Sequence, residues 1–175
     1  MRKLSILSYI FAGLMLSSCD GYLKEDPRDQ LYPEDAYDTP QNGYLNTVAS
    51  LYNYIGGYSD SQGLQGTYRG VYDLNTFTTD EAMLPTRGGD WYDGGFWQGL
   101  FLHKWGTNSD AIQATWEYLY KVIVLSNQSL EILGELRQKT DYNDLDRYEA
   151  EVRAFRAMYY YYLVDMFGRV PLIVS

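Results

Sequence analysis

The sequence has little of what several classes of protein require. It holds one cysteine and one histidine in 175 residues, which excludes an intramolecular disulfide framework and any multi-cysteine zinc site. Its 14 Lys and Arg are outnumbered by 23 Asp and Glu, and the formal net charge is −9. Nucleic-acid binding depends on clustered basic side chains, so this charge balance argues against nucleic acid as a partner.

What the chain has in excess is tyrosine. There are 19 tyrosines, and aromatic residues make up 17% of the sequence. Hydrophobic residues make up 46% and charged residues 21%, which are the proportions of a folded chain rather than a disordered one. An aromatic content of this size serves either a thick core or a surface that binds ligands through ring faces.

The first residues have the pattern of an export signal. Arg2 and Lys3 precede an apolar run over residues 4–16, as in a secretory signal peptide. The run is too short for a membrane-spanning helix, which needs about 20 residues. We therefore predict a signal peptide over residues 1–18.

The only cysteine, Cys19, follows this run directly. The sequence Leu-Ser-Ser-Cys over residues 16–19 is similar to a bacterial lipobox, in which the chain is cut before the cysteine and the thiol is lipidated. We favour lipidation of Cys19 over the burial that a lone free thiol commonly undergoes. Residues 19–38 contain prolines and many charges without a helical period, so they are expected to form a lipidated extended tether.

Hydrophobic periodicity predicts a mainly helical fold for residues 39–175. Thr39 and Pro40 suit a helix cap and first turn, and Gly168 suits a helix end. The segment over residues 78–107 is rich in Gly, Trp and Asp and has no clear period; such a long irregular segment is usually functional. The run of four tyrosines at 159–162 covers a full helical turn, which predicts that this turn is buried on most sides. The predicted helices cover residues 40–55, 68–77, 108–134 and 144–167, and continuation of the third helix for one turn past Gly134 is left open.

The last predicted helix and the residues after it resemble the signature segment of the SusD/RagB family. The resemblance rests on Arg-Ala at 156–157, Leu-Val at 163–164 and Phe-Gly-Arg-Val-Pro-Leu at 167–172. The start of the chain from Cys19 to Pro27 and the segment 79–95 also resemble the family. The resemblance thus covers the whole chain.

This resemblance implies an outer-membrane, surface-exposed lipoprotein that captures oligosaccharides for import through a SusC-type TonB-dependent transporter. It implies a largely helical, SusD-like fold, in which helical-repeat (TPR-like) helix pairs support a long irregular ligand-binding region. It also implies a protein that is not an enzyme and needs no cofactor or metal. Family members are much longer, so residues 39–175 are expected to be the N-terminal portion of an incomplete SusD-like domain.

Sugar sites combine aromatic faces, which stack on the apolar face of a pyranose, with planar polar side chains that bond to its hydroxyls. Residues 78–108 contain both kinds. In the starch-binding member of the family, the ligand is bound by an Asp, an Arg, and a Trp that is followed three positions later by an Asn. The resemblance matches these residues to Asp80, Arg87, Trp105 and Asn108. Trp97 is an alternative match for the tryptophan. Each of these side chains also has a purely structural interpretation, as loop core or turn cap. The candidate ligand-binding residues are Asp80, Arg87, Asp90, Trp91, Trp97, Trp105 and Asn108.

Two other functions remain open. The helical face can serve only to dock a channel partner, without a sugar site of its own. A hydrolase is also conceivable, since glycosidases use paired acids and Asp90 and Asp93 lie three residues apart. The single His103 is interpreted as a bystander, because no cysteine or further histidine accompanies it.

Overall fold

The computed structural model describes residues 35–56, 63–64, 70–89 and 92–174. Cys19, the predicted signal peptide and most of the predicted tether lie outside them. The chain divides into residues 1–35 and 36–175, and the account below concerns the second unit. The described elements are η1 (Asp35–Tyr37), α2 (Pro40–Tyr44), η2 (Leu45–Ala49), α3 (Ser50–Gly56), α4 (Val71–Phe77), η3 (Asp93–Gly95), α5 (Phe96–Phe101), α6 (Asp110–Lys139) and α7 (Leu145–Phe167).

The described residues form helices and no β-strand, which confirms the mainly α fold class. The helical-repeat arrangement stays a prediction, since these residues contain one long helix pair. Across the part of the chain that is described, no helix combines the length and the apolar character that crossing a membrane requires.

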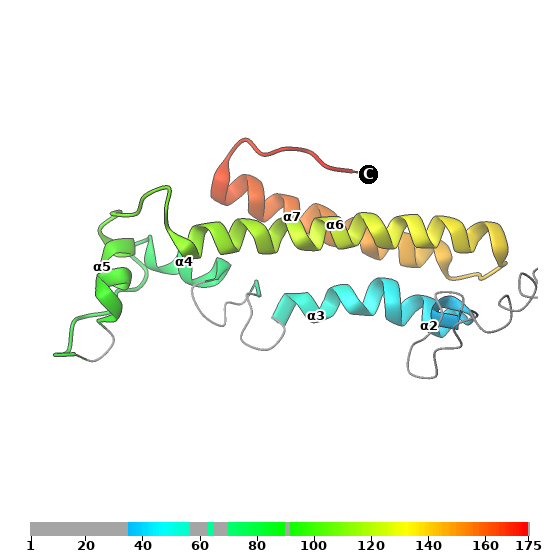
Figure 1. Cartoon of the computed structure of the whole chain (residues 1–175), viewed down its shortest axis with the longest axis horizontal. Helices are drawn as coiled ribbons and strands as arrows, with labels where there is room; N and C mark the ends of the chain where they lie inside the picture. The colour runs from blue at the N-terminus through cyan, green and yellow to red at the C-terminus, as the bar shows by residue number, and fades with distance from the viewer. Residues whose placement is uncertain (1–34, 57–62, 65–69, 90–91, 175) are drawn as a thin grey trace, which may run out of the picture. The chain divides into compact units, whose positions relative to one another are not determined.

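The long helices α6 and α7 form the centre of the fold and run antiparallel, side by side (Figure 1). The buried positions of α7 recur every three or four residues, so they form one stripe along the helix. That stripe packs on α6. The α6 helix continues past Gly134, as the sequence left open, and ends at Lys139, because Leu136 also enters the core. The buried residues of α7 are Leu145, Tyr148, Val152, Phe155, Tyr159 and Leu163.

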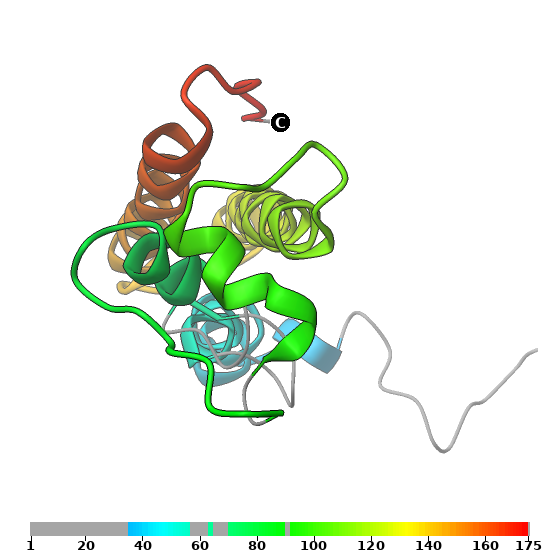
Figure 2. The ribbon, with the colours of Figure 1, turned by 90° about the vertical axis from the view of Figure 1, so that its left-hand side faces the viewer.

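The segment α2–η2–α3 packs against this pair as a third helix, and Figure 2 shows α3, α6 and α7 nearly end-on. The Thr39 hydroxyl accepts a hydrogen bond from the Asn42 backbone N–H at 3.1 Å, as predicted for a cap. The middle of the segment, η2, is a turn of π-helix. There the Ser129 hydroxyl donates to the Thr47 carbonyl at 3.0 Å, which ties η2 to α6.

The last residues of the predicted tether belong to the folded unit. The Asn46 amide donates to the Ala36 carbonyl at 2.7 Å, and the Tyr142 hydroxyl donates to the Asp38 carbonyl at 2.8 Å. Tyr37 packs on the core beside them. Residues 36–38 are therefore held by side chains of η2 and of the connection between α6 and α7, and they do not extend freely.

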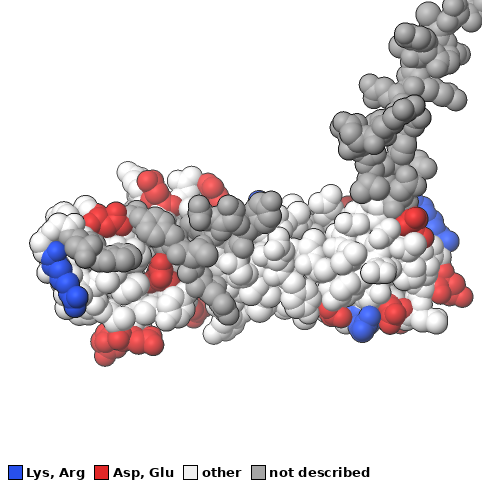
Figure 3. All heavy atoms as spheres, turned by 90° about the horizontal axis from the view of Figure 1, so that it is seen from below, with Lys and Arg blue, Asp and Glu red and all other residues white. Residues whose placement is uncertain are grey.

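Charged side chains are unevenly spread over the face on the side of α2 and α3. In Figure 3 they gather toward the two ends of this face, and the surface between them is largely uncharged. Basic and acidic side chains are mixed at both ends. This face therefore presents no continuous basic patch in its described part, in keeping with the acidic net charge.

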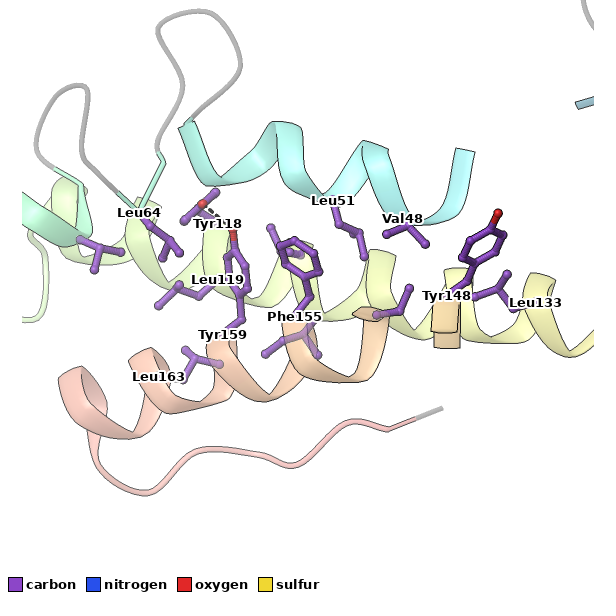
Figure 4. Packing of buried hydrophobic residues seen from close by; sticks show 14 of the residues in the cluster. Val48, Leu51, Leu64, Tyr118, Leu119, Leu133, Tyr148, Phe155, Tyr159 and Leu163 are labelled. Atoms are coloured by element: carbon purple, nitrogen blue, oxygen red, sulfur yellow. Dashed lines mark hydrogen bonds between the residues drawn. The ribbon is translucent and has the colours of Figure 1, made fainter. Parts of the chain in front are cut away.

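A chain of hydroxyl groups joins the three helices inside the core. The Tyr118 hydroxyl on α6 donates to the Tyr54 carbonyl on α3, and it lies 2.8 Å from the Tyr159 hydroxyl on α7 (Figure 4). Because the single proton of Tyr118 is directed at the carbonyl, Tyr159 is the donor to Tyr118. Burial raises the pKa of Tyr118 to about 12 and also raises the pKa of Tyr159, so both hydroxyls stay protonated at neutral pH.

The four consecutive tyrosines are not buried together, and that expectation was wrong. Tyr159 is fully buried, whereas Tyr161 is 65% exposed. Tyr160 and Tyr162 are half-buried at the edges. Tyr159 lies on the stripe of α7 that faces α6, whereas Tyr161 lies outside that stripe. Consecutive residues lie 100° apart around a helix, so they meet different surroundings.

The residues after α7 return beside the helix pair (Figure 1). The helix ends at Gly168, whose positive φ of 75° suits glycine. Two side chains then hold the backbone of Ile173: the Tyr160 hydroxyl donates to its carbonyl at 2.9 Å and accepts from its N–H at 2.6 Å, and the Asn127 amide donates to the same carbonyl at 3.1 Å. Ile173 therefore has partners for both of its backbone groups, while the apolar side chains of residues 172–174 are largely exposed.

A second, smaller core lies where α4 and α5 meet the start of α6. Its buried members are Leu74, Trp97, Leu100 and Ala111. Met166 near the end of α7 packs against this core and also against the main one. The small core thus attaches the irregular segment between α4 and α6 to the helix pair.

We predict that Tyr118→Phe lowers the free energy of unfolding by about 1–3 kcal/mol, because it leaves the Tyr54 carbonyl and the Tyr159 hydroxyl without their buried partner. Urea denaturation of the chain measures this. Tyr161→Phe is the matched control, since it removes the same hydroxyl from an exposed site and is expected to change stability by no more than about 0.5 kcal/mol. Equal effects of the two substitutions would contradict the role given to the buried hydroxyl chain.

Candidate functional site

The candidate site lies in the segment that links α4 to α6. This segment is mostly irregular, as predicted, but it also contains the short helix α5, which the sequence pattern did not predict. A sharp turn leads into α5: Gly94 and Gly95 have positive φ angles of 64° and 82°, which glycine adopts without strain. The turn directs α5 back onto the second core.

Trp97 is part of that core. It is 4% exposed, and its ring centre lies 5.0 Å from those of Phe77 and Phe96, in edge-to-face arrangements. Its ring is therefore covered by protein and is not available for stacking on a sugar. In this structure Trp97 packs α5 against α4.

Trp105 is placed differently. It follows α5, is 45% exposed, and its ring centre lies 5.3 Å from that of His103. The His103 ring nitrogen Nε2 lies 2.7 Å from the Thr78 carbonyl oxygen. A carbonyl only accepts, so Nε2 carries the proton. His103, which we interpreted as a bystander, thus connects Trp105 to the end of α4 and helps to fix its position.

Trp105 and Asn108 line one open hollow of about 440 Å³, which we call the Trp105–Asn108 hollow. Phe96 and Leu100 of α5 supply its apolar part, and Lys104 supplies a cation. The remaining lining comes from Gly94, Gly95, Gly99, Gly106 and Ser109. Glycine has no side chain, so at four of these positions no side chain stands between the backbone and the hollow.

The other predicted residues do not join this hollow. Asp80 and Arg87 are exposed on the stretch between α4 and η3 and are not among its described lining residues. The Gln98 amide, which lies 3.2 Å from the Leu84 carbonyl oxygen, anchors that stretch to α5. Asp90 and Trp91 lie outside the described residues, and Tyr92 is 50% exposed.

Several lining residues escaped sequence reasoning. Lys104 directly precedes the predicted ligand residue Trp105, and this position in the sequence could have marked it as a candidate. Phe96 and Leu100 gave no signal, because a helix of six residues is too short to show a period. Among the residues that the structure describes, no three of His, Cys, Asp and Glu form a group that could hold a metal ion.

The hollow offers an exposed indole, an amide, an ammonium group and open backbone. This combination suits an uncharged, hydroxyl-rich ring with one apolar face, since the indole covers the apolar face and the polar groups bond to the hydroxyls. No hydrogen bond to a described residue occupies the side chains of Lys104 or Asn108. Both are therefore available to a ligand.

Comparisons with known proteins point to one family. Residues 45–175 match the model of a SusD-like family, which is described as starch-binding and associating with the outer membrane. The SusD-like protein P25 of Formosa agariphila is 25% identical over 175 residues, which cover 98% of this chain and 31% of that protein. The starch-binding protein SusD of Bacteroides thetaiotaomicron is 27% identical over 110 residues, which cover 63% of this chain and 18% of that protein.

The chain thus spans less than a third of the length of these two relatives. No solved structure matched it.

The two tryptophans give a stability test of their different positions. Trp97→Ala is expected to lower the free energy of unfolding by about 3–5 kcal/mol, because it empties the centre of the second core. Trp105→Ala, at a half-exposed site, is expected to lower it by less than about 1 kcal/mol. Chemical denaturation of both variants measures the difference, and similar losses would show that the assignment of core and surface is mistaken.

Proposed function

Because this chain belongs to the SusD-like family of outer-membrane-associated proteins, we propose that it binds oligosaccharides at the Trp105–Asn108 hollow and hands them to a SusC-type TonB-dependent transporter for import. In this proposal the protein is not an enzyme. It is held at the outer membrane, on the cell surface, by lipid on Cys19. The substrate, the transporter partner and the lipid anchor are proposals, because the two relatives are much longer than this chain.

One observation supports the proposal most: Trp97 and Trp105, the two alternative matches for the ligand-binding tryptophan, differ in their exposure to solvent. Trp97 is enclosed, while Trp105 is 45% exposed at the edge of an open hollow that also contains Asn108. An exposed indole beside an amide is the arrangement that sugar stacking needs. The family description as starch-binding agrees with this use of the site.

Asp80 and Arg87 are proposed as secondary contacts. Both are exposed, and both lie on the stretch that Gln98 anchors to α5. A longer glycan that leaves the hollow along this stretch would meet them. Asp90 and Trp91 follow on the same segment and are proposed in the same role.

The test is calorimetric titration of the chain with mono- and trisaccharides of glucose, xylose, mannose and galactose. At least one sugar is expected to bind, and Trp105→Ala is expected to weaken that binding about tenfold or more, equivalent to about 1.4 kcal/mol or more. Asn108→Ala is expected to weaken it by a smaller factor, because it removes hydrogen bonds but no stacking surface.

Tyr161→Ala is the matched control, since it removes an exposed aromatic ring of α7 that is not among the lining residues of the Trp105–Asn108 hollow. It is expected to leave the affinity unchanged. Unchanged binding in Trp105→Ala would refute the site. Release of reducing ends from any of the sugars by the purified protein would refute the non-catalytic role.

A further inference from the structure

A second hollow lies next to the first one and is not used by the function proposed above. It has a volume of about 340 Å³ and is lined by residues of α4, α6 and α7 together with Leu100 and Trp105. We call it the α4–α7 hollow. Trp105 and Leu100 line both hollows, so the two meet at these side chains.

The α4–α7 hollow has an apolar floor. Leu74 and Leu100 are 5% and 2% exposed and belong to the second core. Ile112 from the first turns of α6 and Met166 from the last turn of α7 pack beside them. The floor is thus made of the residues that join α4, α5, α6 and α7, so it is held by the folded core and not by a loop.

Polar groups stand at the rim of this floor. Asn75 and Asp165 line the hollow and are exposed. Neither side chain makes a hydrogen bond or ion pair with a described residue. The Thr78 hydroxyl is already engaged with the Leu74 carbonyl at 2.7 Å. The Asn75 amide and the Asp165 carboxylate are therefore available to hydrogen-bond to a ligand in the hollow.

An apolar floor with a rim of hydrogen-bonding groups matches a pyranose ring, which has an apolar face and an edge of hydroxyls. A carboxylate accepts hydrogen bonds from two hydroxyls at once, and an amide both donates and accepts. The two hollows have similar volumes and share the indole between them. Because Trp105 and Leu100 line both hollows, a sugar chain that stacks on Trp105 in the first hollow has the second hollow next to it.

We infer that the α4–α7 hollow is a second sugar subsite, so that the ligand is an oligosaccharide of two or more rings that passes Trp105. Asn75 and Asp165 bind the hydroxyls of the ring in this subsite. The inference rests on the proposed function, since it assumes that a sugar occupies the Trp105–Asn108 hollow.

The test compares the affinity for a trisaccharide with that for its monosaccharide, using the same glucose, xylose, mannose and galactose pairs. The unchanged chain is expected to bind a trisaccharide about tenfold or more tightly than the monosaccharide, because the second subsite adds its own contacts. In the double variant Asn75→Ala, Asp165→Ala this ratio is expected to fall severalfold toward one. In Asn108→Ala both affinities are expected to fall together.

The double variant Asp141→Ala, Asn143→Ala is the control. It removes the same two side-chain types from exposed positions in the connection at the opposite end of α6, and it is expected to leave the ratio unchanged. A ratio that survives Asn75→Ala, Asp165→Ala overturns the inference, as does the absence of any preference for the trisaccharide. If none of the sugars binds at all, the proposed function itself fails, and that outcome is distinct from the other two.

Discussion

The burial of one stripe of α7 against α6 is the constraint on which the rest of the structure depends. Each fully buried side chain of the stripe contributes about 1.5–3 kcal/mol through the removal of apolar surface from water. Several of the other described segments attach to the same helix pair. The hydroxyl of Tyr118 fixes α3 through the Tyr54 carbonyl, Ser129 fixes η2, and Tyr160 holds the returning backbone at Ile173.

This constraint also shapes the candidate site. The first turns of α6 carry Ile112 and the last turn of α7 carries Met166, and both meet the second core that holds α5. Trp97 packs α5 into this core, which fixes the point from which the residues after α5 begin. Among these residues is Trp105, which lines both hollows. Trp105 and Asn108, which are proposed to bind the ligand, lie on an irregular segment, but the surface beneath them belongs to packed helices, an arrangement that favours a preformed site.

Much of the helical framework was predictable, because long amphipathic helices carry a repeating apolar signal: the predicted ends at Thr39 and Gly168 agree with the structure. The roles of the aromatic residues were not predictable from their local sequence. Trp97 and Trp105 both lie among glycines in the sequence. Their burial differs because Phe77, a residue of α4, covers Trp97. In the same way Tyr161 and Tyr159 are two positions apart on α7, but only the latter points at a neighbouring helix. Burial of this kind depends on tertiary packing, which a local pattern does not contain.

The central claim is that Trp105, and not the enclosed Trp97, meets the ligand. The chain has four tryptophans, so a ¹⁵N-correlated NMR spectrum resolves at most four indole N–H signals, which single Trp→Phe substitutions assign. Titration with the trisaccharide that binds best is expected to shift the Trp105 signal strongly and to leave that of Trp97 nearly unmoved. A shift of the Trp97 signal with the Trp105 signal unmoved would contradict the account.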